Sequence, residues 1–168
     1  MSHKFSERDR NIVVKRLASI TGRALVPAIP GKRKVLKDDL DNYYVVLGGR
    51  SWHGIERESC DFIAAHANAS KLVIAIKSCE AMTVYMGDFA PFLASRARMN
   101  LEGASEQYQV HVEERWDRLV VKGIPSDSLP DYSLARVDVV EYGDRPDSRA
   151  AYATAEASIV GALEKLAT

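Results

Sequence analysis

The feature that most limits the fold is the shortness of the connections between the predicted β-strands in the middle of the chain. KLVIAIK (71–77) is the strongest strand candidate, and only a few residues containing SCEA separate it from TVYMG (83–87). Likewise, QYQVHVEERW (107–116) runs directly into DRLVVKG (117–123). Parallel neighbours need a crossover of roughly a dozen residues or more, whereas antiparallel neighbours need only a short turn. Both pairs are therefore predicted to be antiparallel.

Helical and further strand patterns surround these pairs. Ser6 is a suitable N-cap for a helix to Ile20, in which Val13 and Leu17 share one face, and Gly22 is a suitable stop. More helices are expected after Gly54 up to residue 66, over 89–99 and over 146–166, and more strands over 43–47 and 135–143. We predict a single α+β domain over 1–168, comprising a mixed, mainly antiparallel sheet with about four helices packed on it.

The composition favours a cytoplasmic protein without membrane contact. Hydrophobic residues make up 46% of the 168 residues and charged residues 27%, and no run approaches the roughly 20 apolar residues of a membrane span. The first ten residues are too polar for a secretory signal. Because Cys60 and Cys79 are the two cysteines, we expect reduced thiols rather than a disulfide framework, each buried as a small hydrophobic side chain.

A neutral total charge hides an uneven distribution. The N-terminal segment 1–37, interpreted as a basic helix and loop, has ten basic residues against Glu7 and Asp9, a net charge of +8, so the other 131 residues carry −8. This asymmetry indicates either a polyanionic partner or oppositely charged surfaces that meet, within one molecule or between copies. The ten are Lys4, Arg8, Arg10, Lys15, Arg16, Arg23, Lys32, Arg33, Lys34 and Lys37.

The leading hypothesis is that this basic segment binds nucleic acid. Pro27 and Pro30 exclude a regular helix and Gly31 favours a turn, so the segment is expected to form a loop or an edge hairpin. Its basic residues would contact phosphates, with the polar face of the first helix beside them. The proposed contacts are Arg23, Lys32, Arg33 and Lys34. The alternative is a solvated surface, or neutralisation by Asp38, Asp39 and Asp41, which follow directly.

The glycine-rich stretch GGRSWHGIE (48–56) is a second candidate for ligand contact. A histidine flanked by glycines on a loop allows close approach of a ligand, and Trp52 can stack on a base while Arg50 holds a phosphate. The alternative is a tight strand-to-helix turn in which the tryptophan covers the core. No nearby carboxylate or second histidine assigns a catalytic role to His53.

A metal-dependent nuclease or phosphodiesterase is the second hypothesis. Asp61 precedes Lys77 at the end of a hydrophobic strand, as in many nucleases, but Ala75 stands where a second acid is needed. Glu80 or Asp88 would have to supply it, with His53 nearby, and Mg²⁺ would then be the cofactor. The alternative is a solvated lysine at a strand end. Otherwise no cofactor is expected.

The remaining histidines indicate no metal site. No two of His3, His53, His66 and His111 have ligand spacing on a helix, and His66 is interpreted as a core residue bonded to a backbone carbonyl. His111 and Glu113 share one strand face, a pairing that is usually just solvated.

A third hypothesis is a non-catalytic assembly subunit. The apolar stripe of the predicted 146–166 helix would then form a homodimer contact, unless it packs in the core, and the +8 and −8 portions would meet between copies.

Overall fold

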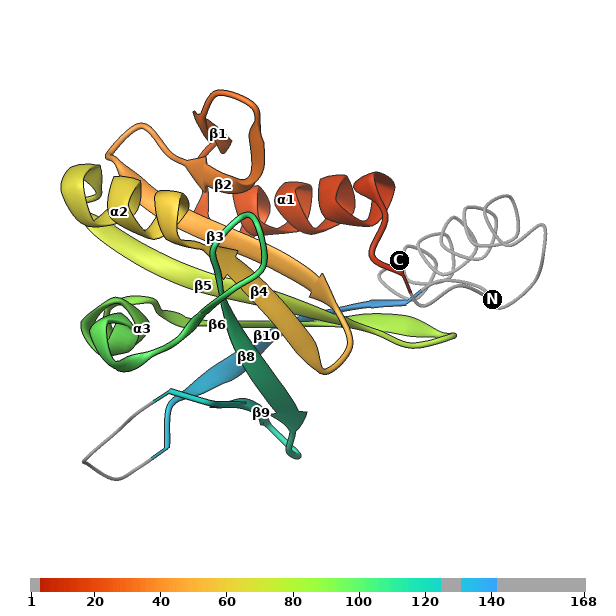
Figure 1. Ribbon diagram of the computed structural model, residues 1–168. Helices are drawn as coiled ribbons and strands as arrows, with labels where there is room; N and C mark the ends of the chain where they lie inside the picture. The colour runs from red at the N-terminus through yellow and green to blue at the C-terminus, as the bar shows by residue number, and fades with distance from the viewer. Residues whose placement is uncertain (1–3, 125–130, 142–168) are drawn as a thin grey trace, which may run out of the picture.

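The computed structural model describes residues 4–124 and 131–141 and consists of one highly curved sheet with helices on it (Figure 1). The strand order is β1-β2-β3-β5-β6-β10-β9-β8-β4, and β7 pairs with β8. Only β3 and β5 are parallel among the described pairs, so the predicted α+β class with a mixed, mostly antiparallel sheet is confirmed. The strands are β1 (Val26–Ile29), β2 (Lys32–Lys37), β3 (Asn42–Gly49), β4 (Trp52–Glu56), β5 (Ala69–Lys77), β6 (Ala81–Asp88), β7 (Leu101–Glu102), β8 (Gln107–Glu114), β9 (Arg118–Lys122) and β10 (Ser133–Glu141).

The described part contains three α-helices rather than about four. They are α1 (Glu7–Thr21), α2 (Arg57–His66) and α3 (Ala90–Ser95), the last continued by a short 3-10 turn, η1 (Arg96–Arg98). The predicted helix over 146–166, and with it the predicted dimer contact, lies outside the described residues. Among the helices that are described, none has the length and apolar character needed to cross a bilayer.

Helix α1 has the predicted boundaries. The Ser6 hydroxyl accepts from the Asp9 amide at 3.1 Å, and the Asp9 carboxylate accepts from the Ser6 amide at 2.9 Å, which satisfies two backbone donors at the helix start. Gly22 ends the helix with a φ of 72°, a conformation that costs glycine little.

The proline-containing segment after α1 forms an edge hairpin, which confirms the second of the two predicted alternatives. Strands β1 and β2 pair through Ile29 and Lys32, and Gly31 in the turn has a φ of 78°. Pro27 is tolerated because β1 is the end strand of the sheet, where one row of backbone amides needs no partner. The hairpin places three consecutive basic residues directly after its turn.

Strand β4 was not predicted, and the expected strand-to-helix turn at GGRSWHGIE is wrong. The segment turns at Arg50 and Ser51 and then pairs with β8, His53 opposite Val110 and Ile55 opposite Tyr108. Ile55 was assigned to the following helix, whereas it is a strand residue buried in the core. Local periodicity did not reveal β4 because its partner lies about fifty residues away and β4 has only five residues.

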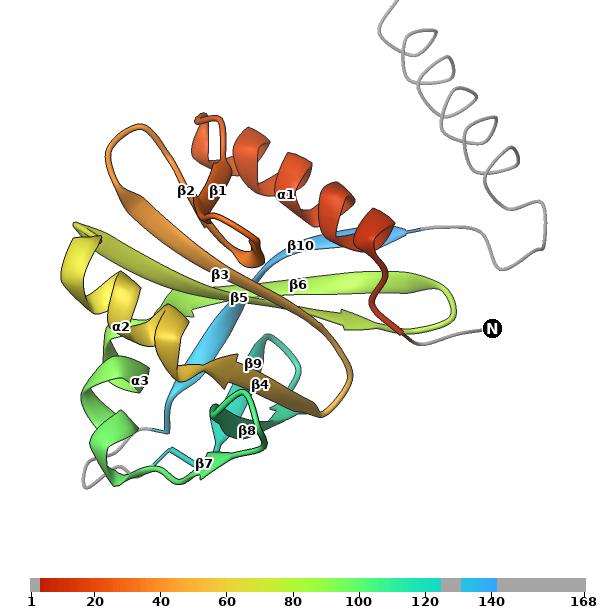
Figure 2. The same cartoon turned by 45° about the horizontal axis from the view of Figure 1, so that its top comes forward.

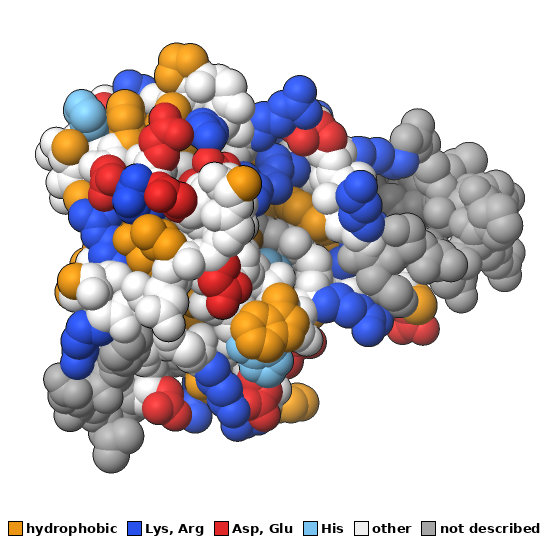
Figure 3. All heavy atoms as spheres, in the orientation of Figure 1, with side chains coloured by type: hydrophobic (Ala, Val, Ile, Leu, Met, Phe, Trp, Pro, Cys, Tyr) orange, Lys and Arg blue, Asp and Glu red, His pale blue; other side chains and the backbone are white. Residues whose placement is uncertain are grey.

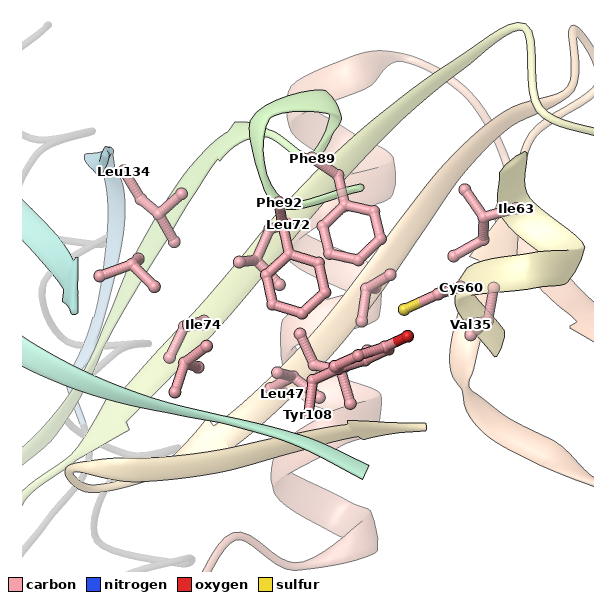
Figure 4. Packing of buried hydrophobic residues seen from close by; sticks show 14 of the residues in the cluster. Val35, Leu47, Cys60, Ile63, Leu72, Ile74, Phe89, Phe92, Tyr108 and Leu134 are labelled. Carbon is pink, nitrogen blue, oxygen red and sulfur yellow. The ribbon is translucent and has the colours of Figure 1, made fainter. Parts of the chain in front are cut away.

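The sheet curls so that hydrophobic clusters form on both of its faces (Figure 2). The first cluster lies between β5 and β8 and includes residues from α2 and α3, among them Cys60, Phe89, Phe92 and Tyr108 (Figure 4). Two members stack: the rings of Phe89 and Phe92 are 4.9 Å apart. Cys60 is buried as predicted, but Cys79 is exposed, and the prediction for it is wrong because it lies in the β5–β6 turn.

The second cluster lies under α1, whose Val13 and Leu17 are fully buried against the opposite face of the sheet. Phe5, just before the helix, packs on Gly48 of β3, where an added Cβ would lie 2.2 Å from the ring. The guanidinium carbon of Arg10 lies 5.1 Å from the centroid of the same ring. The N-terminal end of α1 is therefore seated on the glycine-containing end of β3.

Replacing Gly48 with alanine is expected to lower the free energy of unfolding by about 1–3 kcal/mol, because the methyl group displaces Phe5. In a Phe5→Ala background the same change should cost much less, since the obstructing ring is gone. Urea denaturation of the four proteins measures the difference. Equal costs in both backgrounds would show that Phe5 does not seat α1 on β3.

Candidate nucleic-acid interface

A groove lies between the start of α1, the hairpin β1–β2 and the junction of β4 with α2. Its volume is about 330 Å³. Basic side chains dominate its wall, four against two acidic ones. The lining residues are Glu7, Arg10, Gly31, Lys32, Arg33, Lys34, Glu56 and Ser59. Figure 3 shows Lys and Arg side chains gathered over the region of α1 and the hairpin on this side of the molecule.

At least five of the ten basic residues of 1–37 have carboxylate partners within the described part of the chain. The pairs are Arg16–Asp138 at 3.3 Å, Arg23–Asp39 at 2.9 Å, Lys32–Glu56 at 2.5 Å, Arg33–Glu7 at 3.2 Å and Lys37–Asp41 at 3.9 Å. The acidic run after the hairpin thus neutralises part of the segment, as the alternative interpretation expected. Asp38 is buried and accepts instead from the Leu40 amide at 2.9 Å and the Asn42 amide at 3.0 Å, which holds the turn before β3.

Arg10 faces the groove and was not singled out from the sequence. Its guanidinium donates to the Val46 carbonyl and lies over the Phe5 ring. A signal was available, because Arg10 is three residues before Val13 and seven before Leu17, which places it on the inward side of α1. Arg10 therefore adds a cation held by β3 to the basic side chains of the hairpin.

Lys34 has no carboxylate partner among the residues that the structure describes. It lies on β2 and lines the groove, and its charge also acts on His53. Arg10 and Arg33 line the same groove, so three cations face one hollow whose two lining acids are already paired, Glu7 with Arg33 and Glu56 with Lys32. This arrangement is suited to an anion rather than to a cation.

His53 is a structural residue of the β3–β4 connection. It is 5% exposed, and its Nε2 donates to the Arg50 carbonyl at 2.9 Å, because a carbonyl can only accept. Burial lowers the pKa of the His53 imidazole, and the positive charge of Lys34 lowers it further, against the raising effect of the bond to Arg50. The ring is therefore neutral at pH 7 and fixes the turn that presents Arg50 and Trp52.

Trp52 does not cover the core, so that interpretation of the stretch is wrong. Its side chain points outward from β4 and is 68% exposed, and the ring centroid lies 4.8 Å from that of His111 on β8 with the planes tilted by 53°. Arg50 is exposed in the turn and lines a second hollow of about 620 Å³ together with Ser51, Lys77 and His111. His111 joins the two features, because it lines this hollow with Arg50 and contacts the exposed ring of Trp52.

The residues proposed for a nuclease site do not converge. Asp61 on α2 pairs with Arg96 at 3.0 Å, Lys77 pairs with Asp9 at 2.7 Å, and Asp88 pairs with Lys71 at 2.5 Å. Glu80 lies in the β5–β6 turn. Asp61 lines a hollow of about 510 Å³ that none of His53, Lys77, Glu80 or Asp88 lines.

The faces of the sheet separate these residues further. On β5, Lys77 lies on the same face as Val73 and Ala75, which is the face that α1 covers. On β4, neighbouring side chains point to opposite sides, so His53 shares its side with Ile55, which packs in the first cluster. Within residues 4–124 and 131–141, no three His, Cys, Asp or Glu side chains are grouped to hold a metal.

The other two described histidines are solvated. His66 is exposed, so the core position expected for it is wrong, although its Nδ1 does lie 2.9 Å from the Phe62 carbonyl. His111 does not pair with Glu113, which is instead held between Lys122 and Arg115. Hydrogen bonds from those two cations lower the pKa of Glu113 to about 2.

Comparisons with known proteins do not assign a function to the residues of the groove or of the β3–β4 connection. No family model, curated protein or solved structure matches the chain significantly. The geometry of the basic groove and of the neighbouring turn is therefore the basis for assigning a function.

Either Asp9→Asn or Lys77→Met is expected to lower the free energy of unfolding by about 3 kcal/mol at neutral pH, because each leaves a mostly buried charge without its counter-charge. The double variant should lose less than the two single losses together. Chemical denaturation of all four proteins measures this coupling. Additive losses would show that Lys77 is not engaged with Asp9 in solution and is available for chemistry.

The Asp9–Lys77 pair also predicts an acid dependence. Burial alone would raise the pKa of Asp9, but hydrogen bonds from Lys77 and Ser6 outweigh it and lower the pKa below its ordinary value. The stabilisation is therefore present above about pH 4 and is lost as the pH falls through the lowered pKa. Wild type and Asp9→Asn should accordingly converge in stability at strongly acidic pH.

His53 predicts a second pH effect in a separate range. The unfolded chain binds a proton on this ring below about pH 6.5, whereas the lowered pKa of the folded chain delays protonation, so the free energy of unfolding falls as the pH drops through the unfolded value towards the lowered one. This fall should be shallower in His53→Gln. In Lys34→Gln, NMR titration should show a higher His53 pKa than in wild type. A His53 resonance that titrates at the ordinary value in wild type would contradict its buried position.

Proposed function

We propose that the chain binds nucleic acid through the groove between α1 and the hairpin β1–β2, with the Arg50–His53 connection at its border. The observation that carries the proposal is the group of Arg10, Arg33 and Lys34 around one hollow, in which Lys34 has no acidic partner among the described residues. Phosphate oxygens are the ligands that such a group of guanidinium and ammonium donors prefers.

The ion pairs at the groove do not prevent phosphate binding. Arg33 and Glu7 are 73% and 50% exposed at their side chains, and an exposed pair of this kind contributes only about 0–1 kcal/mol. A phosphate can replace Glu7 at low cost. Lys32 is different, because it is half-buried and held at 2.5 Å by Glu56, with Glu58 at 3.7 Å. We therefore assign Lys32 to the support of the hairpin and Arg33 and Lys34 to phosphate contact.

Contacts of this kind position the protein on the polymer without reading its sequence. Each phosphate neutralised releases bound counterions, so affinity should fall as salt rises. Arg23 contributes less than the hairpin cations, since Asp39 holds it at 2.9 Å and it does not line the groove. The nuclease alternative has no converging site in the described part of the chain, and the assembly alternative depends on a helix outside it.

The test is fluorescence anisotropy with labelled DNA and RNA oligonucleotides over a salt series. Lys34→Gln should weaken binding and reduce the slope of log affinity against log salt by about 0.7–0.9, the value for one lost phosphate contact. Lys71→Gln is a matched control, because Lys71 is paired with Asp88 and does not line the groove. Absence of affinity for both DNA and RNA at low salt would refute the proposal.

A further inference from the structure

The outward face of strands β4 and β8 is an open, mixed aromatic and amide surface. On β8, Tyr108, Val110 and Val112 point into the first cluster, so Gln107, Gln109 and His111 alternate with them and point outward. On β4, Trp52 lies opposite His111 and Gly54 lies opposite Gln109.

None of the described helices covers this face. The buried residues of α1 belong to the second cluster, and those of α2 and α3, such as Ile63 and Phe92, belong to the first. The face is therefore formed by outward side chains of a sheet whose other side is already packed. Trp52, with 68% of its surface exposed, is its most prominent feature.

The glycine of β4 shapes this surface. A Cβ at Gly54 would lie 2.1 Å from Gln107 Oε1 and 2.8 Å from Gln109 Nε2, so the two amides extend over the glycine. Gln109 Nε2 donates to Gln107 Oε1 at 3.3 Å. Both amides keep further donor and acceptor capacity beside the Trp52–His111 pair.

Strand β4 joins this face to the basic groove. Trp52 points outward, while the next residue, His53, lies close enough to Lys34 for the charge of the lysine to lower the pKa of the ring. Glu56, the last residue of β4, lines the groove and holds Lys32. A polymer whose phosphates occupy the groove would thus have its bases within reach of the outward face of β4.

We propose that this face, defined by Trp52, Gln107, Gln109 and His111, binds the unpaired bases of a single-stranded nucleic acid, an inference that rests on the proposed function of the groove. An exposed indole accepts any base by stacking, and the amides can pair with exposed base edges. In a duplex the base faces are stacked on each other and the Watson–Crick edges are paired, so the indole has no free base face to stack on and the phosphates remain for the groove. The occupant is therefore single-stranded, and stacking on Trp52 is the contact by which the protein distinguishes it from a duplex.

Tryptophan fluorescence tests the free surface first. The chain has two tryptophans, and the second, Trp116, lies between β8 and β9 and is 88% exposed, so Trp116→Phe leaves Trp52 as the sole reporter. In the free full-length protein, acrylamide should quench Trp52 readily, and oligo-dT or oligo-rU should protect it. Protection of Trp52 before any ligand is added would mean that the rest of the chain, or a second copy, covers the face, and would overturn the inference.

Affinity measurements then compare the binding of single-stranded and double-stranded nucleic acid. Trp52→Ala should weaken binding of oligo-dT and oligo-rU by about 5- to 150-fold and leave duplex binding nearly unchanged, with Trp52→Phe intermediate. Trp116→Ala is the matched control and should leave all affinities unchanged. Circular dichroism checks the folding of each variant. We expect all of them to fold, because both tryptophan side chains are exposed.

The outcomes separate the inference from the proposed function. If single strands and duplex bind equally, lose affinity with Lys34→Gln and are indifferent to Trp52→Ala, the inference fails while the groove proposal stands. If neither binds at low salt, both fail. Selective loss of single-strand affinity in Trp52→Ala supports both.

Discussion

Strand β5 is buried on both faces, and the two hydrophobic clusters of the molecule meet along it. Leu72 and Ile74 pack into the first cluster, while Val73 and Ala75 pack into the second. Its edges are also occupied, by β3 in parallel and by β6 in antiparallel orientation. Because the second cluster needs a cover, α1 packs there, and its first turn comes to lie beside the hairpin β1–β2. The basic groove is thus a consequence of how β5 is covered.

In the folded chain, the positive charge of segment 1–37 is partly neutralised by carboxylates, some of which lie far from it in the sequence. Segment 1–37 is strongly basic, but its cations are divided among local and distant carboxylates, from Asp39 nearby to Asp138 on β10. What remains around the groove is a small group centred on Lys34. A phosphate would therefore meet only a few cations in one place, and the net positive charge of segment 1–37 overstates the surface available to it.

Local rules were sufficient for the elements whose signals lie within a few residues. The N-cap at Ser6, the stop at Gly22 and the hairpins of β5–β6 and β8–β9 follow from short-range chemistry, and the structure contains each of them. Strand β4 and the inward position of His53 did not follow, because both depend on pairing with β8. The sequence pointed to Trp52 as a candidate contact residue, and its side chain is exposed, but its neighbour His111 could be recognised only once the two strands were paired.

The sequence by itself determined the class of the fold, the sites of the main turns and the stretch in which basic residues concentrate, because strand alternation, capping and the short connections are local properties. Only the tertiary structure decided which of the described cations pair with a carboxylate, which face of β4 carries the tryptophan, and that Lys77 pairs with Asp9. These outcomes depend on the register of strands and the seating of α1, in which residues tens of positions apart compete for the same neighbours.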